Sequence, residues 1–98
     1  MIMIEKILQS KEVLDLLKKN HVSMLGLFGS VARNEADEHS DIDLVIKFSR
    51  QTGLFTHVRL KRELSAILGK DVDLLTEKSI SPYLRENIMN DLRVIYHG

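Results

Sequence analysis

The sequence predicts an α/β (α+β) fold in which a small mixed β-sheet is flanked by helices. Two observations support this class. Segments with helical periodicity alternate with short apolar runs typical of strands, and only one proline interrupts the chain. The chain has 98 residues, of which 44% are hydrophobic and 29% are charged, as in a single globular domain. We therefore expect residues 1–98 to form one domain.

The first elements are expected to be a helix and a central strand. Between Ile4 and Leu17 the apolar residues recur at helical spacing, with a break near Ser10. The run Val22–Phe28 is almost entirely apolar and ends at Gly29, which is typical of a strand covered on both faces. A short polar helix should follow the turn at Gly29.

A second strand and a long helix should come next. Apolar and polar residues alternate in Asp41–Phe48, which predicts a strand. Its apolar face should carry Ile42, Leu44 and Ile46. Helical spacing continues from Leu54 to Leu68, and Gly69 is a typical residue just past a helix end. The apolar residues that trace this helix are Leu54, Phe55, Val58, Leu60, Leu64, Ile67 and Leu68.

The last elements are expected to be a strand, a helix and an edge strand. Val72–Leu75 is a short apolar run. Ser81 and Pro82 are typical of a helix start, with Ser81 as the N-cap and proline at the first helical position. The buried side of that helix should hold Tyr83, Ile88, Met89 and Leu92. Residues 93–98 can add a fourth strand at the edge of the sheet.

Composition limits the compartment and the partners. The 14 basic residues balance 14 acidic residues, which argues against extended binding to duplex nucleic acid. The chain has no cysteine, no signal-peptide core and no apolar run long enough to span a membrane, so we expect a cytoplasmic protein. The four histidines show no pair at ligand spacing, so we expect surface histidines and no transition-metal site.

Two aspartates at the start of the second strand, Asp41 and Asp43, form the most informative pattern. Residues two apart in a strand point to the same face with α-carbons about 6.5–7 Å apart, so both carboxylates can approach one cation. An isolated pair of this kind is more often a solvated strand face, but Asp43 lies in a strand otherwise built for burial. Such oxygen ligands suit Mg²⁺, which is usually held by a few carboxylates and substrate phosphates. The pattern indicates a nucleoside triphosphate substrate.

A third acid in the next strand extends the pattern. Asp73 lies in the apolar run that begins at Val72. Asp71 would share its face but adjoins a turn and should lie at the exposed start of the strand, so we choose Asp73. Three carboxylates on adjacent strands can hold two metal ions about 4 Å apart, as in metal-assisted nucleotidyl transfer.

The Gly29-Ser30 turn completes the candidate site. Glycine at a strand-to-helix turn lets the backbone approach a phosphate closely, and the first amides of the helix and the Ser30 hydroxyl can hold phosphate oxygens. Most Gly-Ser pairs are simple turns. The position of this one directly after a buried strand favours phosphate binding.

The segment LFGSVARNEADEHSDIDLVIKF and the later VDLLT resemble the signature of the minimal nucleotidyltransferases of the DNA polymerase β superfamily. The matching region spans residues 27–76, and the resemblance implies a polymerase-β-like nucleotidyltransferase core. It also implies site residues: catalytic acids and metal ligands at Asp41, Asp43 and Asp73, and nucleotide contacts at Gly29, Ser30 and Arg33. Members often have glycine where this chain has Asn34, a residue that tolerates a left-handed backbone.

The resemblance also implies a partner. Family members of this size are commonly antitoxins encoded beside a HEPN-domain RNase toxin, which implies that AMP is transferred from ATP to a tyrosine of that toxin, with two Mg²⁺ ions as cofactors. One alternative is an inactive antitoxin that neutralises its toxin by masking it. Another is transfer to a small molecule, although so small a chain has little room for a deep acceptor pocket. The oligomeric state stays open, with a homo-oligomer as one alternative.

Overall fold

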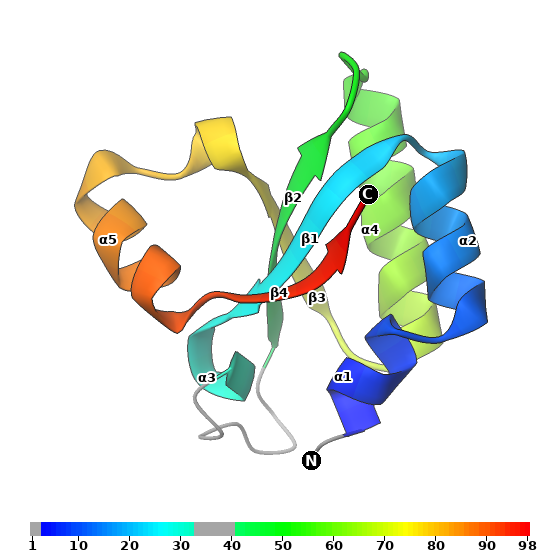
Figure 1. Ribbon diagram of the computed structural model, residues 1–98, viewed down its shortest axis with the longest axis horizontal. Helices are drawn as coiled ribbons and strands as arrows, with labels where there is room; N and C mark the ends of the chain where they lie inside the picture. The colour runs from blue at the N-terminus through cyan, green and yellow to red at the C-terminus, as the bar shows by residue number, and fades with distance from the viewer. Residues whose placement is uncertain (1–2, 33–40) are drawn as a thin grey trace.

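A four-stranded mixed sheet forms the centre of the protein. We describe a computed structural model over residues 3–32 and 41–98, in which the strand order is β3-β2-β1-β4 (Figure 1). Strand β1 is antiparallel to both β2 and β4, whereas β2 and β3 are parallel. This sheet confirms the predicted fold class. The strand bounds are β1 Val22–Phe28, β2 Ile42–Phe48, β3 Val72–Thr76 and β4 Arg93–His97.

Helices cover both faces of the sheet. Helices α2 and α4 lie on one side of the sheet in Figure 1, and α5 lies on the other. The bounds are α1 Met3–Leu8, α2 Lys11–Lys19, α3 Gly29–Ala32, α4 Leu54–Leu68, the 3-10 helix η1 Glu77–Ser79 and α5 Pro82–Asp91. The predicted break at Ser10 is confirmed, because Ser10 caps α2 and its hydroxyl accepts a hydrogen bond from the Val13 amide at 3.5 Å.

The larger core fills the space between the sheet and helices α1, α2 and α4. The predicted apolar face of β2 lies in it, since Ile42, Leu44 and Ile46 are fully buried. The opposite face of the sheet has a smaller cluster made by Met24, Phe28, Val45, Ile80 and Ile88. Each fully buried side chain of this size contributes about 1.5–3 kcal/mol of hydrophobic stabilisation. The larger cluster therefore dominates the stability of the fold, and α5 depends on the smaller one.

The first turns of α4 carry exposed apolar side chains. Leu54, Phe55 and Val58 are 77%, 92% and 43% exposed, although they belong to the apolar pattern that predicted the helix. The fully or nearly fully buried residues of α4 are Leu60, Leu64 and Leu68, which are one turn apart. Helical spacing identifies one face of a helix, but only the second half of this face meets the core.

The buried side predicted for α5 was right for two of its four residues and wrong for the other two. Tyr83 is 92% exposed and Met89 is 39% exposed, whereas Ile88 is buried and Leu92 is partly buried. Ser81 occupies the N-cap position as predicted, but its side chain makes no capping hydrogen bond. The smaller cluster contains few side chains, and Ile88 is the only residue of α5 among its buried members, so the cluster covers about one turn of the helix.

Side chains of α4 form hydrogen bonds with backbone groups at the outer edge of β3. A ring nitrogen of His57, Nε2, lies 2.8 Å from the Leu74 carbonyl oxygen, and the Val72 amide donates to the Ser65 hydroxyl at 3.2 Å. His57 is therefore half-buried and bonded rather than a solvated surface residue as expected. An edge strand with unpaired backbone groups is a site for aggregation, and these bonds protect β3 from it.

Candidate active site

Asp43 and Asp73 form a cross-strand pair at one end of the sheet. In the parallel register of β2 and β3, Asp43 is the partner of Asp73, and the two strands run about 4.8 Å apart. Partners in this register point to the same face of the sheet. Asp43 is partly buried and Asp73 is exposed, so the pair is open to solvent on the β3 side.

The Gly29 turn lies directly against Asp43. Gly29 has a φ of +76°, a left-handed conformation that side chains rarely adopt. A Cβ atom added there would collide with Oδ2 of Asp43. The pairing of Phe28 with Asp43 in the antiparallel ladder of β1 and β2 explains this proximity. Glycine is therefore required at this position by backbone conformation and by space.

Asp41 and Asp71 lie just before the same two strands. Both are exposed, and the Ile42 amide donates to the Asp71 carbonyl oxygen at 2.9 Å, which ties the two strand starts together. The position of Asp71 at the exposed start of β3 confirms the expectation from the sequence. Asp41, Asp71 and Asp73 line a hollow of about 330 Å³ whose other lining residues are Lys61, Ser65 and Val72.

The structure therefore divides the three predicted acids between two environments. Asp41 and Asp73 line the hollow, whereas Asp43 lies against Gly29. Among residues 3–32 and 41–98, no group of three or more histidine or acidic side chains is close enough to hold a metal ion.

The donor set nevertheless fits Mg²⁺. All the candidate ligands are carboxylate oxygens, the type that Mg²⁺ prefers, and it usually takes only a few of them together with phosphate oxygens. The turn at Gly29 leaves backbone beside Asp43 where any other residue would place a side chain. The assignment of Asp41, Asp43 and Asp73 as metal ligands stays a prediction.

Two predicted nucleotide contacts are less fully defined. Gly29 and Ser30 begin α3, as expected for a turn that opens a helix, but the Ser30 side chain is not described. Arg33 lies outside the described residues, as does Asn34. Their predicted roles are therefore not tested by the geometry.

Lys61 is a candidate site residue that the sequence analysis missed. It projects from α4 into the lining of the hollow, together with Ser65 one turn later. In the sequence it belongs to a run of basic residues that is typical of a solvated helix face. In the structure, the Val72 amide donates to the Ser65 hydroxyl, which places that turn of α4 over the start of β3. The sequence carries no signal for this contact.

The fold and this arrangement define a class of protein. A glycine turn after a buried strand, an Asp-x-Asp at the start of the next strand and a third acid on the strand beside it are the groups that the sequence analysis predicted for a nucleotidyltransferase site. Residues 6–98 match the family described as polymerase beta, nucleotidyltransferase. The chain belongs to this family and is a nucleotidyltransferase.

Curated relatives share most of the chain. A protein of Methanocaldococcus jannaschii named as a candidate protein adenylyltransferase is 44% identical over 81 residues, which cover 83% of this chain and 87% of the relative. The protein adenylyltransferase MntA of Thermococcus cleftensis is 32% identical over 78 residues, which cover 80% of this chain and 79% of that protein.

Solved structures share the fold. A candidate minimal nucleotidyltransferase is 38% identical, with a TM-score of 0.74 and 85% of each chain covered. A tri-AMPylated HEPN toxin of Shewanella oneidensis in complex with an MNT antitoxin includes a chain that is 21% identical, with a TM-score of 0.69, covering 96% of this chain and 73% of that chain. None of the helices in residues 3–32 and 41–98 combines the length and the apolar character of a membrane span.

Proposed function

We propose that this protein is a Mg²⁺-dependent protein adenylyltransferase that transfers AMP from ATP to a tyrosine of a HEPN-family toxin. The names of its relatives support the reaction, since the Thermococcus protein is called a protein adenylyltransferase. The Shewanella complex supports the acceptor, because its HEPN toxin is AMPylated and bound to an MNT antitoxin. The absence of cysteine fits a reducing compartment, and we propose the cytoplasm.

The observation that carries this proposal is the order of groups across the end of the sheet. The Gly29 turn lies against Asp43, and Asp73 lies beyond Asp43 on the adjacent strand. The turn offers backbone amides to the terminal phosphates of ATP, and the Ser30 hydroxyl is a further donor. Displacement at phosphorus requires the attacking and leaving oxygens to be roughly in line. If the leaving phosphates are held at Gly29, the acceptor approaches from the β3 side.

Each acid then has a role in the transfer. Asp41, Asp43 and Asp73 would hold Mg²⁺, which supplies charge stabilisation at the phosphates and activates the acceptor hydroxyl when bound. The acceptor oxygen forms a bond to the α-phosphorus, the bond between the α-phosphorus and its bridging oxygen to the β-phosphate breaks, and pyrophosphate leaves. Asp73 accepts the hydroxyl proton from the β3 side. Arg33 would contact phosphate or a neighbouring acid.

The hollow beside β3 supports an acceptor supplied by a protein. Its volume is about 330 Å³, and Asp73 and Lys61 line it. Pockets for small molecules run from about 300 to 1,000 Å³, so this one is at the small end of that range. A docked protein can provide the missing wall and hold its tyrosine hydroxyl near Asp73.

Intact-mass spectrometry tests the proposal directly. The protein is incubated with a HEPN-domain toxin, ATP and Mg²⁺, and this partner should gain one or more AMP increments. The Asp41→Asn/Asp43→Asn variant should give none, whereas the Lys18→Gln variant, changed at an exposed residue of α2, should act as the wild type does.

The masking antitoxin is the second candidate function. The strongly exposed Leu54 and Phe55 at the start of α4 favour it, because adjacent exposed apolar side chains are typical of protein contacts. The same experiment separates the two functions. A partner that is silenced while its mass stays unchanged would contradict adenylyl transfer and support masking.

A further inference from the structure

The first half of helix α4 exposes large apolar side chains to solvent. Leu54, Phe55 and Val58 are all exposed. Leu54 and Val58 lie one turn apart, and Lys61 and Ser65 continue the same face of the helix at helical spacing. Lys61 and Ser65 line the hollow at the candidate active site. One face of α4 therefore leads from exposed apolar side chains to that site.

A basic hollow adjoins the start of this helix. Its volume is about 680 Å³, and its lining includes Lys47, Arg50 and Lys78. Thr52, two residues before α4, lines it as well, and Glu77 supplies a carboxylate. In Figure 1 the end of β2 and the start of α4 lie at the same end of the molecule, opposite α3. Cationic and apolar groups are thus neighbours at the end of the sheet away from the predicted metal ligands.

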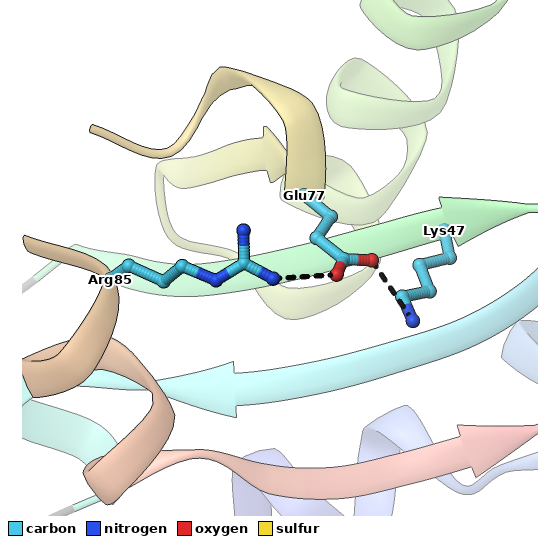
Figure 2. Close-up of polar contacts among 3 residues, drawn as sticks. All are labelled: Lys47, Glu77 and Arg85. Atoms are coloured by element: carbon cyan, nitrogen blue, oxygen red, sulfur yellow. Dashed lines mark hydrogen bonds and ion pairs between the residues drawn. The ribbon is translucent and has the colours of Figure 1, made fainter. Parts of the chain in front are cut away.

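The charges in the hollow are unequally compensated. The Glu77 carboxylate lies between two cations, with Oε2 2.9 Å from Lys47 Nζ and Oε1 3.2 Å from Arg85 Nη2 (Figure 2). Arg50 and Lys78 are exposed, and neither forms an ion pair with any residue of 3–32 or 41–98. These two cations are therefore available to an anionic group from another molecule.

Hydrogen bonds hold the two segments that carry these cations. After β2, the amide and the hydroxyl of Ser49 both donate to the His21 carbonyl oxygen, at 2.8 and 3.0 Å. In η1, the Ser79 hydroxyl donates to the Thr76 carbonyl oxygen at 2.9 Å. A backbone that is held in place loses less conformational entropy when a partner binds. Both cations therefore extend from segments that suit a binding surface.

We propose that a HEPN toxin docks on this end of the molecule, with acidic side chains on Arg50 and Lys78 and apolar side chains against Leu54, Phe55 and Val58. We call these five residues the docking surface. The identity of the partner rests on the proposed function. Opposite charges across an interface favour the correct partner and speed its association, and buried aromatic residues are common anchors. The docking surface would serve adenylyl transfer and masking alike.

One toxin can contact the docking surface and the candidate active site together. Lys61 lies seven residues after Leu54, which is about 10 Å along the helix. A stable interface covers about 800 Å² on each partner and is wide enough to include both. A toxin seated on the exposed face of α4 would extend along it to the hollow lined by Asp73, where its tyrosine is needed.

Calorimetric titration with a HEPN-domain toxin, without ATP, tests the charged part of the docking surface. Arg50→Glu/Lys78→Glu should raise the Kd about tenfold or more, whereas Arg50→Lys/Lys78→Arg, which keeps both charges, should bind as the wild type does. Lys11→Glu/Lys18→Glu is the matched control, since it makes the same change of charge at two exposed residues of α2. Equal Kd values for the two charge-reversed variants would overturn the proposal.

Phe55→Ala tests the apolar part. The side chain is exposed, so the unfolding midpoint in urea should stay unchanged. The Kd for the toxin should rise about tenfold or more, as the loss of an aromatic anchor commonly causes. Tyr83→Ala is the control, because Tyr83 is an equally exposed aromatic residue on α5, and its Kd should match the wild type. Equal Kd values for the two alanine variants would overturn the proposal.

The docking surface and the proposed function can fail separately. If the wild type binds the toxin but adds no AMP to it, the transfer reaction fails and the titrations still decide the docking surface. A wild type that forms no complex with the toxin would overturn the docking surface. Self-association, or binding of a single-stranded RNA, that Arg50→Glu/Lys78→Glu abolishes while toxin affinity stays unchanged would assign the surface to that ligand and overturn the proposal.

Discussion

Gly29 is the residue at which backbone conformation and site chemistry meet. Gly29→Ala should lower stability by about 1–3 kcal/mol, because the left-handed backbone is strained for alanine and the new Cβ collides with Asp43. ATP binding should be lost with it, since Asp43 must move. Urea unfolding and calorimetry check the two effects.

Gly69→Ala is the control for backbone strain alone. Gly69 has a φ of +68°, close to that of Gly29, but an added Cβ there meets nothing within 4 Å. It should lose stability through strain while it binds ATP as the wild type does. Equal ATP affinity in both alanine variants would contradict the contact between Gly29 and Asp43 as a requirement of the site.

The titration of Glu77 predicts a pH dependence of stability. A hydrogen bond from Lys47, together with the charges of Lys47 and Arg85, holds the pKa of Glu77 below its ordinary value. The charged form is thus favoured in the folded state. The contribution of ionised Glu77 to the free energy of unfolding is complete above the ordinary glutamate pKa of about 4.3. It is lost as pH falls through the lowered pKa of the folded state.

Urea midpoints measured from neutral pH down to the acid range check this sign. The difference between the wild type and Glu77→Gln should be constant near neutral pH and should shrink below the ordinary glutamate pKa. Because the side chain is partly exposed, the effect should be modest and should weaken with added salt. A difference that grows as pH falls would contradict the assignment.

At the scale of elements, the sequence was informative where local pattern determines structure. The strand Val22–Phe28 and the helix Leu54–Leu68 have the bounds expected from their apolar runs, and Gly69 ends the helix with the expected left-handed conformation. Asp43 and Asp73 could be expected to meet because a helix that joins two strands commonly makes them parallel neighbours. The two aspartates could be expected at the same level because each lies near the start of the apolar run that forms its strand.

What could not be predicted depends on contacts between elements. The exposure of Phe55 follows from where the sheet ends beneath α4, and the sequence of α4 does not contain that information. Lys61 lines the same hollow as Asp41, Asp71 and Asp73 because of where α4 lies relative to β3. The anchoring of α5 by Glu77 requires Lys47 and Arg85 to meet from segments that are distant along the chain.

Helices α2 and α4 are joined by a buried polar contact that predicts a measurable loss of stability. Asn20 is only 5% exposed, its Nδ2 donates to the Leu16 carbonyl at 2.8 Å, and its Oδ1 accepts from Arg59 at 2.9 Å. Asn20→Ala should cost about 1–3 kcal/mol, because it leaves buried groups without partners. Urea unfolding checks this, with Lys19→Ala at an exposed neighbouring position as control. Equal small losses for both variants would contradict the role of Asn20.

At the scale of the whole molecule, a formal net charge of zero conceals a separation of charge. Asp41, Asp43, Asp71 and Asp73 lie at the starts of the two parallel strands or just before them. Lys47, Arg50 and Lys78, with Glu77 among them, line a hollow of about 680 Å³ at the other ends of those strands, whereas, within residues 3–32 and 41–98, Lys61 is the one basic residue that lines the hollow at the acidic end. The acidic end is the one where a divalent cation would be attracted, and an ATP molecule alone would be repelled from it.

That separation makes the dependence of ATP binding on metal the most direct test of the account. Calorimetric titration of ATP into the wild-type protein should show binding with Mg²⁺ and little or none in EDTA, because the carboxylates at the site repel the phosphates without a cation between them. Asp43→Asn should weaken the Mg²⁺-dependent binding while the protein stays folded. Equal affinity for ATP in Mg²⁺ and in EDTA would contradict the assignment of these aspartates as the metal and nucleotide site.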